Sequence, residues 1–318
     1  MQKQAVRRKI FKITMTVALI AAVFSFMDLR ILWGALQAMT WEVVALCVVA
    51  EVFYYGVESL RIHALTNGRY GVWIIFKTRM ASVFAGNLLP GAAGAEALRW
   101  LMLERAVSGH KVRLALELMA SRLFGLLSLM LMAVYPLAEQ WGNYGLVALV
   151  AATASVVSGF FMNDANIGRM IRLQSIHFGR KLRTKLLRKT FRTIYLSFQV
   201  AASWHVGVVA LITSVVTTFI AIAEFNWFGQ VFASGVSFAQ WMWLVPLSAV
   251  ATFLPVGVGA VGTQDAALLI AAKTLAIPVE GVIATSVSMH VLRILGTMPG
   301  ALFWLMPMSN ERSSTYTP

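Results

Sequence analysis

Residues 252–266 read TFLPVGVGAVGTQDA, with a proline, several glycines and an aspartate inside otherwise apolar sequence. Proline and clustered glycines do not sustain an unbroken helix. In a soluble domain this stretch would be an ordinary surface turn, whereas in a lipid bilayer it would interrupt a membrane span. The composition of the surrounding chain therefore decides what the stretch means.

The composition is that of a membrane protein. Of 318 residues, 59% are hydrophobic and only 13% are charged, whereas soluble domains carry roughly 25% charged residues. An apolar helix of about 20 residues spans the ~30 Å hydrocarbon core. We therefore predict an all-α polytopic membrane protein. Its apolar segments lie near 10–27, 41–60, 72–90, 112–138, 143–162, 194–223, 238–255, 263–277 and 279–307.

The chain is strongly basic, with 27 Lys and Arg against 13 Asp and Glu. In a membrane protein such an excess is typical of cytoplasmic loops that obey the positive-inside rule, so nucleic acid is not predicted as a partner. Basic residues gather in 1–12, 99–113 and 163–192, whereas 139–143 and 224–240 contain neither Lys nor Arg. We expect a multi-pass protein of the bacterial inner (cytoplasmic) membrane, with both termini cytoplasmic.

Several local segments support this assignment. Residues 1–12, followed by an apolar run, predict an uncleaved signal anchor. Cys47 is the only cysteine, so no intramolecular disulfide forms. The segment 163–192 alternates cations with apolar residues and predicts an interfacial amphipathic helix. The stretches 28–39 and 225–237 resemble interfacial segments with Trp anchors.

Charge counting also predicts two re-entrant hairpins. Residues 61–70 and 99–113 both indicate the cytoplasmic side, so the piece between them, 72–98, must enter and leave on that side. The same counting makes 238–277 a second hairpin that enters from outside. About six full transmembrane helices then accompany two re-entrant helical hairpins.

The two hairpins share a short motif. Leu89-Pro90 with Gly94-Ala95, and the corresponding residues 254–260, both read L-P-x-x-x-G-A. Broken helices at matching places of two inverted halves indicate a transporter-type site near the middle of the membrane. We predict one domain over 1–308, with inverted halves of about 10–138 and 143–307, and a short polar tail at 309–318.

Three motifs resemble the signatures of one family. They are NLLPGAAGAEALR at 87–99, LELMASRLFGLL at 116–127 and FLPVGVGAVGTQDAA at 253–267. In order and spacing they are similar to the lysylphosphatidylglycerol synthase transmembrane family, also called flippase-like or UPF0104. The resemblance covers roughly 10–307 and implies a lipid-translocating membrane domain.

This sequence departs from the family pattern at two places. Where the third signature ends in Gly-x-x-Glu, this chain has Asp265, a carboxylate one methylene shorter. Where the second signature carries an acid before the arginine, Ser121 precedes Arg122. No aminoacyl-transferase domain follows, so we expect no synthase activity.

Charged residues inside apolar segments are the candidates for a functional site. Each costs roughly 2.5–3.5 kcal/mol at the centre of a membrane helix, so a functional role is the default expectation. Arginine forks suit a lipid phosphate, and glycine breaks free backbone N–H groups for an anion. The predicted substrate-binding residues are Asn87, Pro90, Gly91, Gly94, Glu96, Arg99, Arg122, Pro255, Gly259, Gly262, Asp265 and Arg293. The candidates for proton coupling are Glu51, Glu58, Glu117 and His290.

Structural roles compete with these functional ones. Glu96 and Asp265 follow glycine breaks, so either one could cap a helix N-terminus as well as bind a ligand. Arg99 could pair with Glu96 three residues earlier. Glu58 could pair with Arg61 at the membrane edge.

Pairing and packing also compete at the other candidates. Glu117 could pair with Arg113 one turn earlier, whereas Glu51 has no local partner. The glycines could simply allow close helix packing. The sequence leaves these alternatives open.

The leading function is a lipid transporter or flippase that shelters a polar headgroup between the two hairpins. No G-x-x-x-x-G-K-[ST] loop and no cluster of metal ligands is present, so we predict no cofactor, no metal and no direct ATP drive. The expected partners are membrane lipids: an anionic or aminoacylated phospholipid, or a lipid-linked intermediate. A homo-oligomer or a lipid-synthesis enzyme is a further possible partner. The alternatives are a membrane-embedded transferase, with Glu96 or Asp265 as general base, and a non-transporting partner of a lipid-synthesis enzyme.

Overall fold

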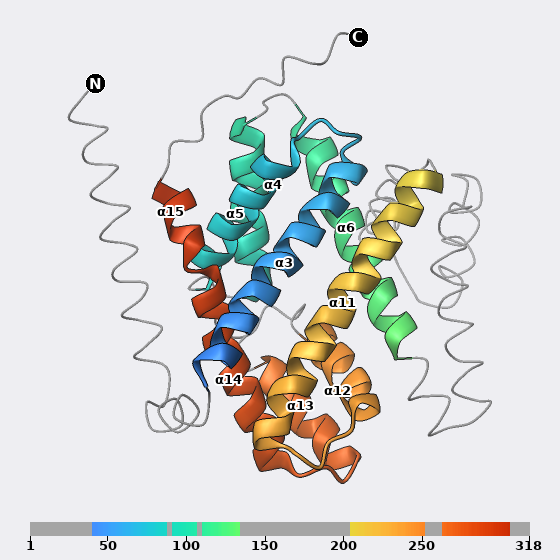
Figure 1. The fold of residues 1–318 in the computed structure, drawn as a ribbon. Helices are drawn as coiled ribbons and strands as arrows, with labels where there is room; N and C mark the ends of the chain where they lie inside the picture. The colour runs from blue at the N-terminus through green and yellow to red at the C-terminus, as the bar shows by residue number, and fades with distance from the viewer. Residues whose placement is uncertain (1–39, 88–90, 107–109, 134–203, 252–262, 306–318) are drawn as a thin grey trace, which may run out of the picture.

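The structure is a computed structural model that describes residues 40–87, 91–106, 110–133, 204–251 and 263–305. Every element in these ranges is an α-helix (Figure 1), which confirms the all-α prediction. Several predicted features lie outside the described residues. These are the apolar segments 10–27 and 143–162, the interfacial stretch 28–39, the amphipathic segment 163–192 and the tail 309–318.

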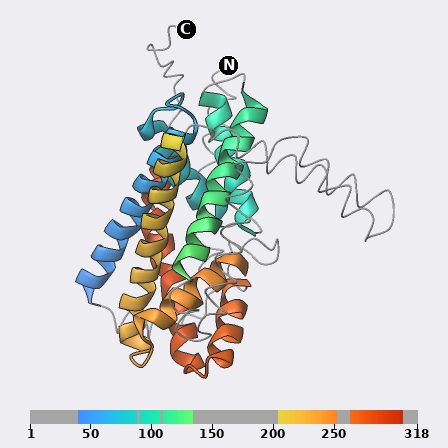
Figure 2. The same cartoon turned by 90° about the vertical axis from the view of Figure 1, so that its right-hand side faces the viewer.

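Four described helices are long and apolar enough to cross a membrane. They are α3 (Trp41–Leu65), α6 (Lys111–Met132), α11 (Trp204–Phe232) and α14 (Val279–Thr297). At about 1.5 Å per residue, even the shortest of them, with 19 residues, reaches the ~30 Å of a bilayer core. In Figure 2, α3, α6 and α11 run alongside one another. The chain is a multi-pass membrane protein.

The helix α3 extends further than its apolar run. Residues 61–65, expected in a cytoplasmic loop, form its last turn, and Arg61 is buried. The helix ends because Asn67 and Gly68 adopt left-handed backbone angles, with φ of 50° and 74°. The N–H of Gly68 then closes the end by donating to the carbonyl of His63 at 3.0 Å.

The helix α11 also continues beyond its expected end. It runs through 224–232, which we expected to belong to an outside segment, because Phe225 and Phe228 are fully buried against neighbouring helices. The connection to α12 is correspondingly short and ends in a capping box. The Ser237 N–H donates to Oε1 of Gln240 at 2.8 Å, and the Gln240 N–H donates to Oγ of Ser237 at 3.3 Å.

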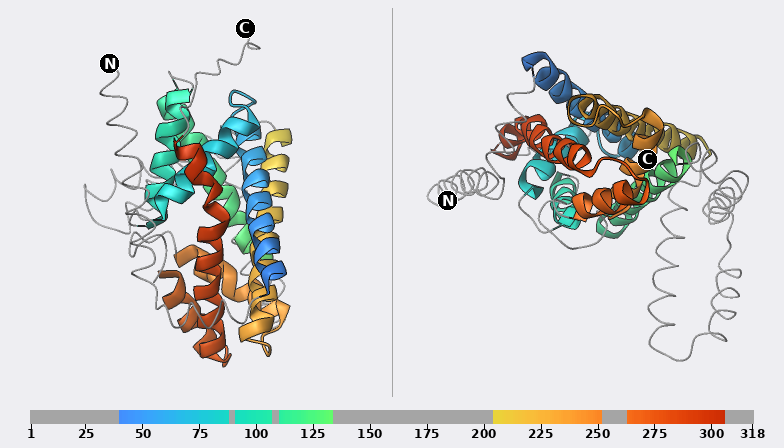
Figure 3. Two further views of the ribbon diagram at one scale, coloured as in Figure 1. Left: turned by 60° about the vertical axis from the view of Figure 1, so that its left-hand side comes forward. Right: turned by 90° about the horizontal axis from the view of Figure 1, so that it is seen from below.

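The segment expected as one span over 279–307 is divided. The helix α14 ends at Thr297, and the short α15 (Pro299–Leu305) follows after Met298. Pro299 lacks the N–H that would continue the hydrogen-bond ladder, so it begins a new helix instead. Figure 3 shows α14 running along the length of the bundle to α15, which packs on α4.

Two pairs of short helices occupy opposite ends of the bundle. The helices α4 (Val72–Gly86) and α5 (Gly91–Ala106) lie in the upper half of Figure 1, and α12 (Phe238–Ala251) and α13 (Thr263–Thr274) lie in the lower half. Within each pair the helices pack on each other. With 12 to 16 residues they are about 18–24 Å long, too short for a ~30 Å core.

Two opposed hairpins would also place their helix pairs at opposite ends of the bundle. No membrane is part of the structure, so entry from two membrane faces stays a prediction. The connections that would form the hairpin tips, 88–90 and 252–262, lie outside the described residues.

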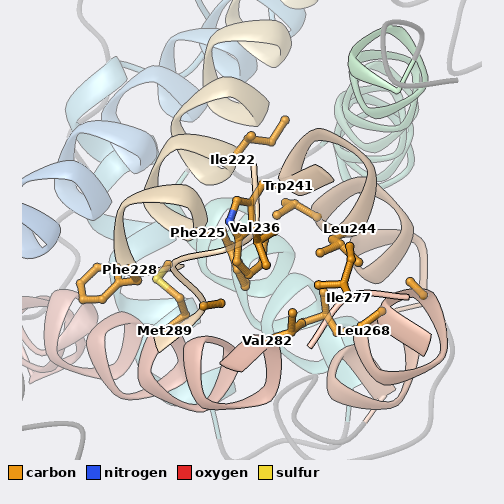
Figure 4. Packing of buried hydrophobic residues seen from close by; sticks show 14 of the residues in the cluster. Ile222, Phe225, Phe228, Val236, Trp241, Leu244, Leu268, Ile277, Val282 and Met289 are labelled. Atoms are coloured by element: carbon orange, nitrogen blue, oxygen red, sulfur yellow. The ribbon is translucent and has the colours of Figure 1, made fainter. Parts of the chain in front are cut away.

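Two apolar clusters flank the middle of the bundle. One joins the second half of α11 to α12, α13 and α14 around Phe225, Trp241 and Leu244 (Figure 4). The other joins the end of α3 to α4, α5, α6 and the start of α11 around Ile62 and Phe124. The charged residues predicted from sequence lie on helices that these two clusters join.

Candidate functional site

A cavity of about 340 Å³ lies inside the bundle. Every described helix except α15 contributes to its wall. Its charged lining is extensive for a membrane interior, with five arginines and four glutamates, which leaves a formal net charge of +1. These residues are Arg61, Arg79, Arg99, Arg122, Arg293, Glu51, Glu58, Glu96 and Glu224.

One half of the wall is an ion network centred on Glu58 of α3. Its Oε2 accepts a bond from Nε of Arg79 at 2.7 Å, and its Oε1 accepts one from Nη1 of Arg99 at 2.9 Å. The guanidinium of Arg61 lies 3.6 Å from the same Oε1. Three arginines thus surround one buried carboxylate, which supplies the compensation that buried charge requires.

Glu96 of α5 extends the network across the cavity. Its Oε1 accepts a bond from Nη1 of Arg79 at 2.6 Å and lies 3.5 Å from Nη2 of Arg122 on α6. Arg79 therefore bridges two carboxylates, and its guanidinium also lies 5.6 Å from the ring centroid of Tyr55. The side chain of Arg122 is 29% exposed and is the most open arginine of this network.

The other half of the wall holds two acids and one arginine. Nε of Arg293 on α14 lies 3.3 Å from Oε1 of Glu51 on α3. Glu224 of α11 is 5% exposed, and within the described part of the chain its Oε1 has no hydrogen-bond partner. This half has a formal charge of −1, with two glutamates against one arginine, whereas the network of Glu58 and Glu96 has two glutamates against four arginines.

Helical periodicity brings these side chains together. On α3, Glu51, Tyr54, Tyr55 and Glu58 recur at three- and four-residue steps and share one face. On α11, Thr217, Ala221 and Glu224 follow the same spacing. Long-range hydrogen bonds hold these faces in place: Arg61 donates to Ser214 at 2.8 Å, and Ser128 of α6 lies 2.6 Å from Thr218 of α11.

A glycine sets the distance between α3 and α14. A Cβ added to Gly296 would lie 2.9 Å from Cβ of Glu51, closer than real Cβ atoms approach one another. Gly296 follows Arg293 by one helical turn. The missing side chain therefore lets α14 come close enough for Arg293 to reach Glu51.

A comparison with protein families matches residues 9–300 to the family described as the lysylphosphatidylglycerol synthase TM region. The chain belongs to the lysylphosphatidylglycerol synthase transmembrane family. The match spans nearly all of the chain and confirms the resemblance carried by the three motifs. Membership ties this membrane protein to lipid metabolism. Comparisons with curated proteins and with solved structures give no match.

The cavity of this family member contains many of the residues predicted from sequence. Among the predicted substrate-binding residues, Asn87, Glu96, Arg99, Arg122 and Arg293 line it, and Glu51 and Glu58 of the proton-coupling candidates do so as well. Pro90, Pro255, Gly259 and Gly262 lie outside the described residues. Gly91 and Gly94 belong to the first turn of α5, and Gly94 is not part of the lining.

The local pairings differ from those expected. Arg99 bonds to Glu58 on another helix and not to its neighbour Glu96. Glu96 is the sixth residue of α5, so it is too far along the helix to cap it, and its partners are Arg79 and Arg122. Burial between helices favours these long-range pairs because each arginine can then face the shared cavity.

Glu58 and Glu117 do form the pairs suggested for them. Arg61 lies beside Glu58, and Nε of Arg113 lies 3.2 Å from Oε1 of Glu117. Arg69, in the turn after α3, also bonds to the fully buried Glu117. Glu117 thus links the turn after α3 to α6 at a position outside the cavity, and this role is structural.

Asp265 and His290 form a separate cluster. Asp265 lies in the first turn of α13, where a carboxylate complements the helix dipole. Its Oδ1 accepts a bond from Oγ of Ser286 at 2.5 Å and lies 3.2 Å from Nε2 of His290. Neither Asp265 nor His290 lines the cavity, but the adjacent Gln264 does, with its Oε1 3.5 Å from Nη1 of Arg293.

Three charged residues of the lining, Arg61, Arg79 and Glu224, were not among the site residues predicted from sequence. Glu224 follows the apolar segment expected to end at 223 and begins the stretch 224–240, which contains neither Lys nor Arg. The signal that would have found it is the polar face of α11, where small and polar residues recur every three to four positions up to Glu224. Arg79 lies within the apolar segment 72–90, where a charge is itself a signal for a site.

Proposed function

We propose that this protein is a lipid transporter that shelters the polar headgroup of a phospholipid in the charged cavity while the acyl chains stay in the membrane. The observation that carries the proposal is a cavity with five arginines inside a bundle of apolar helices. Buried charge of this kind is rare in membranes and marks substrate pathways.

The size of the cavity suits a headgroup. Ligand pockets in proteins occupy about 300–1,000 Å³, and the cavity, at about 340 Å³, lies near the lower limit. It has room for a phosphate with a small polar substituent but not for two acyl chains. The chains would therefore remain in lipid during transport.

Arg99 supplies donors for a phosphate. It is 1% exposed and lines the cavity, and none of the described residues accepts a hydrogen bond from its Nε or Nη2. Unpaired buried donors are costly, and guanidinium groups bind phosphate oxygens through two parallel bonds. Arg122 and Arg79 contact the same carboxylate, Glu96, so a phosphate that enters between them would exchange with Glu96 as their anionic partner.

Lipid movement in vesicles tests the proposal. Purified protein is reconstituted with fluorescent phosphatidylglycerol or phosphatidylethanolamine, and dithionite reports which leaflet carries the dye. Wild-type protein should speed exchange above that of empty vesicles. The Arg122→Gln variant should slow exchange tenfold or more, since losing a charge-assisted bond costs about 1.5–3 kcal/mol.

The matched control is Arg113→Gln, because Arg113 is half-exposed and lies outside the cavity. Its rate should equal that of the wild type. Equal rates for vesicles with and without protein, over anionic and zwitterionic lipids, would overturn the proposal. Recovery of chemically altered lipid would support a transferase instead.

The same proposal places the protein in the inner membrane of a bacterium, with both termini in the cytoplasm. Because Cys47 is the only cysteine, a Cys47→Ala background allows single cysteines to be introduced at Gln2 and Ser314. A thiol reagent that does not cross membranes should label neither position in intact cells and both after permeabilisation. Labelling of either position in intact cells would contradict this topology.

A further inference from the structure

Glu224 lines the same cavity but takes no part in the proposed binding of a lipid phosphate. It lies on α11, it lines the cavity, and 95% of its surface is covered. Its Oε1 is buried and has no hydrogen-bond partner among the residues that the structure describes. Burial normally forces a carboxylate to pair with a cation or a donor, so an unpaired oxygen at this depth needs an explanation.

The charged neighbours of Glu224 come from two helices. Glu51 on α3 and Arg293 on α14 act on it electrostatically. Across the cavity, α6 contributes Arg122 to the wall. The helix α12, which also packs on α11, contains no ionisable residue. Glu224 therefore faces one like charge and one shared cation.

That shared cation is already engaged. Nε of Arg293 lies 3.3 Å from Oε1 of Glu51, and its Nη1 lies 3.5 Å from Oε1 of Gln264. The guanidinium also stacks over the ring of Phe225, with 5.5 Å to the centroid. One arginine can compensate one carboxylate fully, so two buried glutamates next to one arginine leave a charge that must be removed in another way.

A proton removes that charge. A buried carboxylate without a partner is expensive, and such a group takes up a proton and becomes neutral. Two acids that share one cation compete for it, so the proton occupancy of one depends on the partner of the other. An anionic phosphate that enters the cavity would draw on the same arginine and change this balance.

We propose that Glu224 is a proton-binding site that couples headgroup movement to proton flow, with Arg293 as the partner that Glu51 and Glu224 exchange. A proton from water in the cavity adds to the Glu224 carboxylate while Arg293 pairs with Glu51. Glu224 releases this proton to water when Arg293 leaves Glu51 and pairs with the Glu224 carboxylate. The inference rests on the proposed lipid transport, because it supplies the driving force for that transport.

A pH gradient across the vesicle membrane tests the coupling. Each unit of pH difference supplies about tenfold lipid asymmetry per proton carried, since 1.4 kcal/mol is a factor of ten. Wild-type vesicles with a gradient of about two units should accumulate labelled lipid in one leaflet, up to about a hundredfold. Adding an ionophore that dissipates the gradient should abolish the accumulation.

The variants locate the coupling at Glu224. The Glu224→Gln protein, isosteric but unable to ionise, should show no response to the gradient when compared with its own exchange rate without one. Glu224→Asp, which keeps the carboxyl group, should retain a response. Glu104→Gln, a buried glutamate outside the cavity, is the matched control and should behave as wild type.

A transport-independent measurement separates this inference from the proposed function. Infrared difference spectra of purified protein, recorded between about pH 5 and pH 9, the range of buried carboxyl groups, should show a protonated carboxyl band that Glu224→Gln removes. A gradient response that survives in Glu224→Gln would overturn the coupling, and so would wild-type exchange that ignores the gradient. In the latter case lipid exchange itself would still stand.

Discussion

Replacing Glu58 by glutamine removes the acid at the centre of the arginine network. Glutamine keeps the size of the side chain but loses the charge, and its amide nitrogen cannot accept the bond that a carboxylate oxygen accepts. Arg79 donates to Glu58 at 2.7 Å and Arg99 at 2.9 Å. Arg79 keeps Glu96, whereas Arg99 loses its acidic partner while only 1% of it is exposed.

The expected cost is large for a single substitution. Removing one member of a buried ion pair destabilises by about 3–5 kcal/mol, because the remaining charge stays buried. Total stabilities are about 5–15 kcal/mol. We therefore expect Glu58→Gln to lower the free energy of unfolding by about 3–5 kcal/mol. Equilibrium unfolding in mixed micelles with increasing SDS, followed by tryptophan fluorescence, measures this difference.

The control is again Arg113→Gln. Its pair with Glu117 spans 3.2 Å, but the Arg113 side chain is 52% exposed, and Glu117 keeps its bond to Arg69. Pairs with an exposed partner contribute about 0–1 kcal/mol. If Glu58→Gln proved as stable as this control, Glu58 would not be the charged anchor of the network, and the reasoning about the cavity would fail.

Three further predictions concern glycines within the helices. A Cβ at Gly86 would lie 2.8 Å from Cα of Ala95, so Gly86→Ala should separate α4 from α5 and cost about 1–3 kcal/mol. Gly56→Ala in α3 meets nothing within 4 Å and should instead stabilise by roughly 0.5–1 kcal/mol. Gly229→Ala would place a Cβ 2.6 Å from the ring of Trp241 and should destabilise by about 1–3 kcal/mol with a change in tryptophan fluorescence. The same micelle titration measures all three, and a Gly86→Ala protein as stable as Gly56→Ala would contradict the close packing.

The sequence predicted the helical membrane fold because a low share of charged residues and apolar runs of about 20 residues indicate helices surrounded by lipid. It placed α3, α6 and the short pair α12 and α13 within a few residues of their observed positions. It failed at helix ends, since these depend on tertiary contacts. The end of α11, for example, is fixed by the burial of Phe225 and Phe228 and not by local composition.

The candidate site was predicted in part for a similar reason. Intramembrane charges can be read from sequence, so Glu51, Glu58, Arg99 and Arg293 were identified before their surroundings were known. Apart from Arg61 beside Glu58, their partners could not be identified, because the other pairs join two helices that are far apart along the chain. Glu224 was not predicted as a site residue, because its apolar segment was expected to end at residue 223, one residue earlier.

The contact between Gly296 and Glu51 has a consequence for how the family varies. The two positions are 245 residues apart, yet a side chain at 296 would occupy the space of the Glu51 stem. Substitutions at the two positions are therefore linked: a relative with alanine or serine at 296 needs a smaller residue at 51, and with it loses the acid that faces Arg293. Aligned relatives should accordingly show glycine at 296 together with glutamate at 51, and paired replacement of both where the acid is dispensable.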